Sequence, residues 1–160
     1  MFKSILGRLF WTYAIILMLV FTSVAVTVGI FVNHFAISTH MNNVISVSQN
    51  LEYWTGSLQI EDTDYRARAA YKQLLRSWGS FLNSDIIVTN SNGEVLESTT
   101  SSATVPDELV HIVTNGNIIK KYSTLNGSYK NKMMVIGVPI KYQGGIVGAS
   151  FYVTGIFDIR

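Results

Sequence analysis

Hydrophobic residues dominate the first part of the chain. From Leu9 to Asn33 there is no Asp, Glu, Lys or Arg, and after Arg8 the next such residue is Glu52. A helix of this length would extend about 37 Å, and a bilayer core of about 30 Å needs roughly 20 apolar residues. A signal-peptide core is shorter, about 7–15 residues, and precedes a small-residue cleavage site, which Thr27-Val28-Gly29 resembles poorly. The pattern therefore predicts a retained transmembrane helix at 9–33, in preference to a cleaved signal or a buried core helix.

The charges around this segment predict its orientation. Lys3 and Arg8 precede it, whereas no Lys or Arg follows it for more than thirty residues, up to Arg66. Because lysine and arginine remain on the cytoplasmic side, residues 1–8 should form a cytoplasmic tip. The chain is then a single-pass protein of the plasma membrane with the lipid bilayer as a partner. Residues 34–160 should be extracytoplasmic.

A seven-residue repeat follows the apolar segment and has two interpretations. Ile37, Val44, Leu51 and Leu58 recur every seven residues, and further residues lie three positions after the first three of them. An amphipathic helix that packs on its own domain would show this pattern, and so would a helix that pairs with its copy in a second chain. We favour the second interpretation, a stalk helix at 34–59 in a homodimer. The predicted dimer seam consists of Ile37, Val44, Val47, Leu51, Trp54 and Leu58.

Residues 60–157 change from a helical to an alternating pattern. Asp62 or Thr63 can cap a helix that ends near residues 79–83, and Pro106 can open a short helix that Gly116 closes. Asn92-Gly93 is a strong hairpin signal between two short β-rich runs. The strand candidates are Ile86–Thr89, Glu94–Glu97, Ile118–Ser123, Lys132–Tyr142 and Ile146–Thr154.

The order of these elements predicts an α+β fold. An N-terminal transmembrane helix continues into the long stalk helix, and an antiparallel sheet of about five strands follows, with helices packed on one face. Pro139, inside the fourth strand candidate, predicts a bulge or an edge position there.

Composition and motifs narrow the function further. The chain has 12 Lys and Arg against 10 Asp and Glu, and the difference equals the two cations of the N-terminal tip, so the outer part is neutral and gives no nucleic-acid footprint. There is no cysteine, which excludes thiol chemistry and cysteine-ligated metals. The three histidines do not have metal-site spacing, and no G-x-S-x-G, P-loop or dinucleotide motif occurs. We therefore predict no catalytic residues, no metal and no cofactor.

Several segments together resemble a known class of receptor. A basic tip, a span and a long helix precede "SDIIVTNSNGEVLESTT", "VPDELVHIVTNG" and "MMVIGVPIKYQGGIVGASFYV". This looks like the N-terminal sensor region of membrane-bound bacterial histidine kinases, in which a PAS-like (Cache-type) extracytoplasmic domain lies between two spans. The resemblance implies a PAS-like sensor domain at 60–157 and a lead-in to a second span at 158–160. The phospho-accepting histidine and the ATP-binding domain of that family have no counterpart in these residues.

The resemblance also implies a function. These residues would be the input module of a two-component sensor histidine kinase, with no enzymatic activity of their own, and would transmit a stimulus by displacement of the stalk helix. Chemoreceptors and cyclases use the same module, so their input domains are the alternative. A pilin-like structural subunit is a weaker alternative, because pilins usually carry a Glu early in the mature helix.

In PAS-like folds a ligand pocket lies between the sheet and the helices. By resemblance, the candidates for binding a small molecule are Tyr71, Trp78, Tyr122 and Tyr152, with Arg66 and Arg76 for an anionic group; Tyr129 and Arg68 are further candidates. The alternative is that the aromatic residues form the core and the basic residues a solvated face. An extracytoplasmic protein could also be the stimulus instead of a small molecule.

Overall fold

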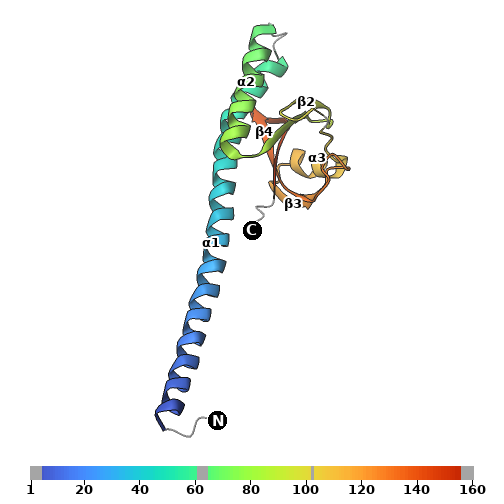
Figure 1. Cartoon of the computed structure of the whole chain (residues 1–160). Helices are drawn as coiled ribbons and strands as arrows, with labels where there is room; N and C mark the ends of the chain where they lie inside the picture. The colour runs from blue at the N-terminus through green and yellow to red at the C-terminus, as the bar shows by residue number, and fades with distance from the viewer. Residues whose placement is uncertain (1–4, 61–64, 102, 156–160) are drawn as a thin grey trace. The chain divides into compact units, whose positions relative to one another are not determined.

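The residues that the structure describes form three helices and five strands (Figure 1). The computed structural model describes residues 5–60, 65–101 and 103–155. The helices are α1 (Ile5–Ile60), α2 (Tyr65–Leu82) and α3 (Asp107–Thr114), and the strands are β1 (Asp85–Asn90), β2 (Val95–Ser98), β3 (Ile119–Ser123), β4 (Met133–Tyr142) and β5 (Gly145–Thr154). The chain divides into two compact units, Met1–His40 and Met41–Arg160. The predicted caps Asp62 and Thr63 and the lead-in at 158–160 lie outside the described residues.

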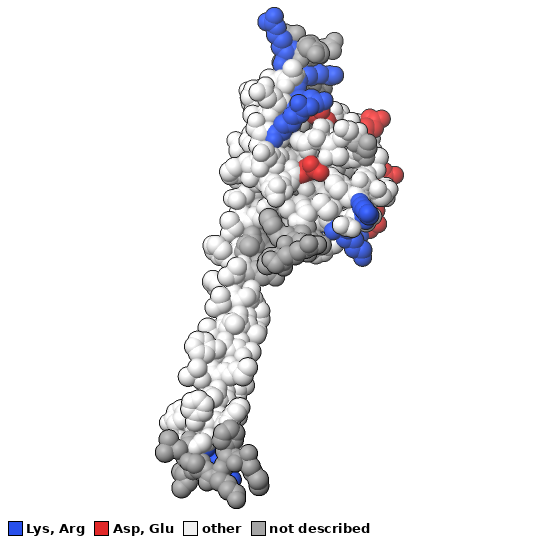
Figure 2. All heavy atoms as spheres, in the orientation of Figure 1, with Lys and Arg blue, Asp and Glu red and all other residues white. Residues whose placement is uncertain are grey.

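The first unit contains the apolar part of α1. Gly7–Val32 has a mean hydropathy of 2.7 and is long and apolar enough to cross a membrane. The hydroxyls of Thr12, Thr22 and Thr27 donate to carbonyls three or four residues earlier, so their polar groups are satisfied inside the helix. Residues 9–32 contain no Asp, Glu, Lys or Arg, and Figure 2 shows the long helix in white above its N-terminal end. These properties fit the predicted single-pass membrane helix.

The second unit is built on one antiparallel sheet with the strand order β2-β1-β5-β4-β3. Every neighbouring pair is antiparallel. The strand order places β1 and β5, the first and last strands in the sequence, side by side. The predicted α+β class and the five-strand sheet are confirmed. Each strand begins and ends within one residue of its predicted position.

Local turn chemistry accounts for this accuracy. Gly93 has a φ of 88°, and the side-chain oxygen of Asn90 accepts hydrogen bonds from the backbone of Asn92 and Glu94, which closes the first hairpin. Between β4 and β5, Gln143 and Gly144 both have positive φ, as a two-residue type I′ turn requires. Pro139 pairs with Ala149 of β5 but lies beyond Gly137, the last residue of β4 that pairs with β3. It therefore has a strand neighbour on one side only, as predicted.

Helices cover both faces of the sheet, and the prediction that they lie on one face is wrong (Figure 1). Ile86 and Val88 of β1 join a core with α1 and α2, whereas Ile87 joins a second core with α3. The same alternation holds in β5, where Tyr152 faces the first core and Phe151 the second. The sheet is therefore the middle of three layers.

Within the second unit, α1 packs on its own sheet. Val44, Val47 and Leu51 have exposed fractions of 0%, 7% and 0% and belong to the same core as Tyr152. The prediction that these three residues form a dimer seam is therefore wrong, because they are already buried within one chain. Trp54 is 44% exposed, and the side chains of Ile37 and Leu58 lie outside the described set. The compact domain accordingly begins near residue 41 rather than at the predicted residue 60.

Candidate functional site

The predicted ligand-binding residues do not come together in one pocket. Tyr71 and Tyr152 are buried in the core between the helices and the sheet, and the partly buried Trp78 packs against it. Tyr122 is 51% exposed on β3, and Arg66 is exposed on α2. Tyr71, Tyr152 and Trp78 therefore belong to the core, which was the alternative interpretation of the aromatic residues. Arg76 lines the two clefts described below.

Hydroxyl groups are concentrated where α1 meets the sheet. The Ser48 and Ser150 side-chain oxygens, from α1 and β5, are 3.3 Å apart, and the Ser150 hydroxyl also donates to the carbonyl of Val138. Seven residues further along α1, the Thr55 hydroxyl oxygen lies 2.6 Å from the hydroxyl oxygen of Tyr71 in α2. The interface between α1 and the rest of the domain is thus partly polar, although it is buried.

The Tyr152 hydroxyl belongs to this buried layer but has no hydrogen-bond partner in the described structure. It lies near Ser48 and Ser150 without meeting either at hydrogen-bonding geometry. Burial raises the pKa of Tyr152, and burial raises the pKa of Tyr71 to about 12. Both phenols are therefore neutral at physiological pH, and the layer holds uncharged hydroxyls.

The opposite face of the sheet is closely packed. Val110 and Val113 of α3, Leu125 and Phe151 belong to its apolar core. Gly137 marks how tight this core is, because a Cβ added there would lie 2.7 Å from Val113 and 2.9 Å from Phe151. Side chains thus fill the space between α3 and β4.

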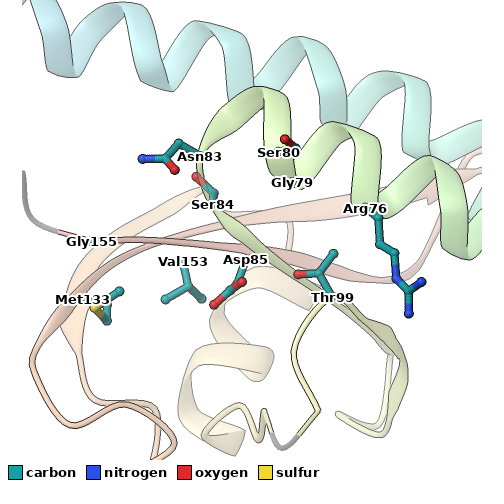
Figure 3. Close-up of a pocket in the computed structure, with 10 residues that line it drawn as sticks. All are labelled: Arg76, Gly79, Ser80, Asn83, Ser84, Asp85, Thr99, Met133, Val153 and Gly155. Carbon is teal, nitrogen blue, oxygen red and sulfur yellow. The ribbon is translucent and has the colours of Figure 1, made fainter.

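A first cleft, of about 410 Å³, lies between the end of α2, the start of β1 and the end of β5 (Figure 3). Arg76 and Asp85 provide its charges, and Val153 and Gly155 form the part closest to the C-terminal end of the domain. The hydroxyl of Tyr129, one of the predicted ligand-binding candidates, donates a 2.7 Å hydrogen bond to the Asp85 carboxylate. Burial and this carboxylate raise the pKa of Tyr129.

A second cleft, of about 630 Å³, lies between α2, β2 and the segment that leads to α3. Lys72 and Arg76 line one side, and a run of small hydroxyl residues lines the other: Ser98, Thr99, Thr100 and Ser101. Arg76 and Thr99 line both clefts and so connect them. Sequence reasoning missed the hydroxyl side, although the composition of "ESTTSSAT" was a signal that could have drawn attention to it.

The side chains in and around these clefts are suited to binding. Arg76 offers a planar guanidinium, Lys72 an ammonium, and the serines and threonines offer hydroxyls that donate or accept. Within residues 5–60, 65–101 and 103–155, no group of three or more His, Asp or Glu could hold a metal ion.

Comparison with known proteins gives a likeness of fold. No protein-family model and no curated protein matches the sequence. Among solved structures, the sensor domain of the Vibrio cholerae histidine kinase DctB is similar over 75% of this chain, with 9% identity and a TM-score of 0.48. The ligand-binding domain of the Campylobacter jejuni chemoreceptor Tlp3, solved with L-valine, is similar over 74% of this chain, with 14% identity and a TM-score of 0.44. The chain covers 53% and 56% of these domains, about half of each.

Proposed function

We propose that this chain is the extracytoplasmic signal-sensing input module of a two-component sensor histidine kinase. The observation that carries the proposal is the composition of α1. One helix contains a membrane-length apolar stretch, Gly7–Val32, and a set of residues that complete the core of the sheet domain. Any change in the packing of that domain on α1 therefore acts on the helix that enters the membrane. Transmission is by displacement of this helix.

The interface between α1 and the sheet is suited to such a displacement. A switch needs two packed arrangements that differ by only a few kcal/mol, because a ligand shifts the balance only by its differential affinity. Each buried hydroxyl pair contributes about 0.5–1.5 kcal/mol net, and an unpaired buried hydroxyl such as that of Tyr152 costs about 1–3 kcal/mol. A small shift of α1 exchanges some of these hydrogen bonds for others at little net cost.

A reversible cross-link between α1 and β5 tests this mechanism. The Ser48→Cys, Ser150→Cys double variant should form a disulfide, because the two native side-chain oxygens are 3.3 Å apart. The sequence has no native cysteine with which either new thiol could pair instead. The cross-link holds α1 in one packing on the sheet. In membranes containing the complete protein, we expect autophosphorylation to differ at least severalfold between the oxidised and the reduced variant.

The two single variants are the matched controls, since each carries the same substitution without the cross-link. Their autophosphorylation should be unaffected by oxidation. If the disulfide forms in full and autophosphorylation is the same before and after reduction, displacement of α1 is not how the signal is transmitted.

The proposal places the N-terminus in the cytoplasm and the sheet domain outside. Single-cysteine variants can measure this because the chain has no native cysteine. Ser80→Cys, on an exposed position of α2, should react with a membrane-impermeant maleimide in intact cells, whereas Ser4→Cys should react only after lysis. The opposite pattern would reverse the orientation, and a mature protein that lacks the first thirty or so residues would mean that the helix is a cleaved signal.

The input domain of a chemoreceptor or a cyclase is the alternative, because the same module serves all three. The coding sequence after Arg160 distinguishes them. A second span followed by a phospho-accepting histidine and an ATP-binding domain supports the kinase, and a long helical signalling hairpin without them supports the chemoreceptor. A homodimer remains a prediction, and its interface would use a face of α1 other than the one formed by Val44, Val47 and Leu51.

A further inference from the structure

The cleft between α2 and β2 has an unusual distribution of charge. Arg68, Lys72 and Arg76 follow each other at four-residue intervals on α2, so they lie in one row along the helix, and Figure 2 shows Lys and Arg gathered on this part of the surface. Like charges at this spacing destabilise a helix by a few tenths of a kcal/mol per pair. The row therefore has a small cost for folding.

The acidic partner available to the row is already engaged. Glu97 of β2 is the one carboxylate among the residues that line this cleft, and it pairs with Lys72 at 3.1 Å. Arg76 makes no ion pair or hydrogen bond with any described residue, and its side chain is exposed. Its guanidinium is available to an incoming group on the same side of the cleft as the Lys72 ammonium.

The opposite side supplies hydrogen-bond donors. The Ser98 oxygen accepts a bond from the backbone N–H of Thr100, which leaves the Ser98 hydroxyl proton to donate elsewhere. The Ser101 hydroxyl makes no hydrogen bond with any described residue and is exposed. The Thr99 hydroxyl, by contrast, bonds the backbone of Ile86 and so holds this segment against β1. Thr99 thus anchors the segment, whereas the hydroxyls of Ser98 and Ser101 can donate to a bound molecule.

We infer that this cleft binds a small molecule through an oxyanion, either a carboxylate or a phosphate group. Arg76 forms a bidentate pair with the oxyanion, Lys72 adds a second positive charge, and Ser98 and Ser101 donate from the other side. The cleft volume of about 630 Å³ lies within the range typical of small-molecule sites. The inference rests on the proposed function only in taking this ligand as the stimulus, whereas the binding itself does not depend on it.

Titration of the full chain in neutral detergent micelles tests the inference. Inorganic phosphate and succinate are the two probes, each added at constant ionic strength with chloride as the balancing anion. We expect saturable binding of at least one probe, which identifies the class of oxyanion. Arg76→Gln should weaken that binding at least tenfold, and Arg66→Gln, on an exposed arginine of the same helix that does not line the cleft, should leave it unchanged.

A second variant changes the affinity in the opposite direction. Glu97→Gln removes the carboxylate that competes for Lys72, so oxyanion binding should tighten severalfold although an ion pair is lost. A purely structural role for that pair would weaken binding or leave it unaltered. The absence of saturable binding of either probe, or equal affinity of the wild type and Arg76→Gln, overturns the inference. The titration measures no signalling output, so either negative result would leave the proposed input function standing. Failure of the cross-linking test would likewise leave the anion site standing.

Discussion

Replacing Leu51 by glutamate is expected to unfold the sheet domain. Leu51 has an exposed fraction of 0% and packs in the core that α1, α2 and the sheet share. Removing a buried leucine side chain costs about 2–5 kcal/mol, and burying an unpaired carboxylate adds several kcal/mol more. A domain of this size is stable by about 5–15 kcal/mol in total. Limited proteolysis and circular dichroism of the full chain in detergent should show the loss of the domain.

Gln49→Glu is the matched control, since it introduces the same charge two residues away on an exposed position of the same helix. Its stability should remain within about 0.5 kcal/mol of the wild type. A Leu51→Glu variant that keeps a protease-resistant domain and only loses an oligomeric state would contradict the structure. That result would support the dimer seam that the heptad pattern predicted.

The failure of the heptad prediction has a physical cause. A helix that pairs with its copy and a helix that packs on its own sheet both need one apolar stripe, so Val44 and Leu51 satisfy either arrangement. Periodicity identifies the buried face of a helix but not what buries it. The presence of Ser48 between them carries some information, because a small polar residue fits well against another small residue such as Ser150 of the sheet.

The sheet was predictable because its signals are local. Asn92-Gly93 and Gln143-Gly144 set the hairpins through residues that tolerate positive φ, and the β-rich runs between the turns need no distant partner to be recognised. The position of α3 was not predictable from its own sequence. The consecutive buried residues Ile86, Ile87 and Val88 did contain the signal, since a strand that is apolar on both sides requires a cover on both faces.

The candidate site was predictable from the sequence only in part. Arg76 stood out in the sequence because the positively charged face of α2 is regular. The hydroxyl run at 98–101 was not linked to it, because twenty-odd residues and two strands separate the two sides of the cleft in the sequence. Tyr71 and Tyr152 look like ligand-binding residues from their chemistry alone, and only the packing of the folded chain places them in the core.

Raising the pH above about 10 is expected to destabilise the domain progressively. Burial raises the pKa of Tyr71 from its ordinary value of 10.0 to about 12. Below pH 10 the phenol is protonated in both the folded and the unfolded chain, so its contribution to stability is complete. Between pH 10 and 12 the unfolded chain releases a proton that the folded chain retains, and stability falls by about 1.4 kcal/mol per pH unit, or about 3 kcal/mol in all. The raised pKa values of Tyr129 and Tyr152 act in the same direction.

Denaturant unfolding at neutral and alkaline pH measures this decline, and tyrosine variants identify its source. Tyr71→Phe and Tyr152→Phe each remove one buried phenol, so the loss of stability at high pH should be smaller in each variant than in the wild type. Tyr53→Phe removes a phenol that is 69% exposed and should leave the decline unchanged. Equal declines in all four proteins would mean that these phenols are not held protonated by the layer between α1 and the sheet. In that case the packing of α1 on the sheet, on which the proposed transmission depends, would be looser than the structure requires.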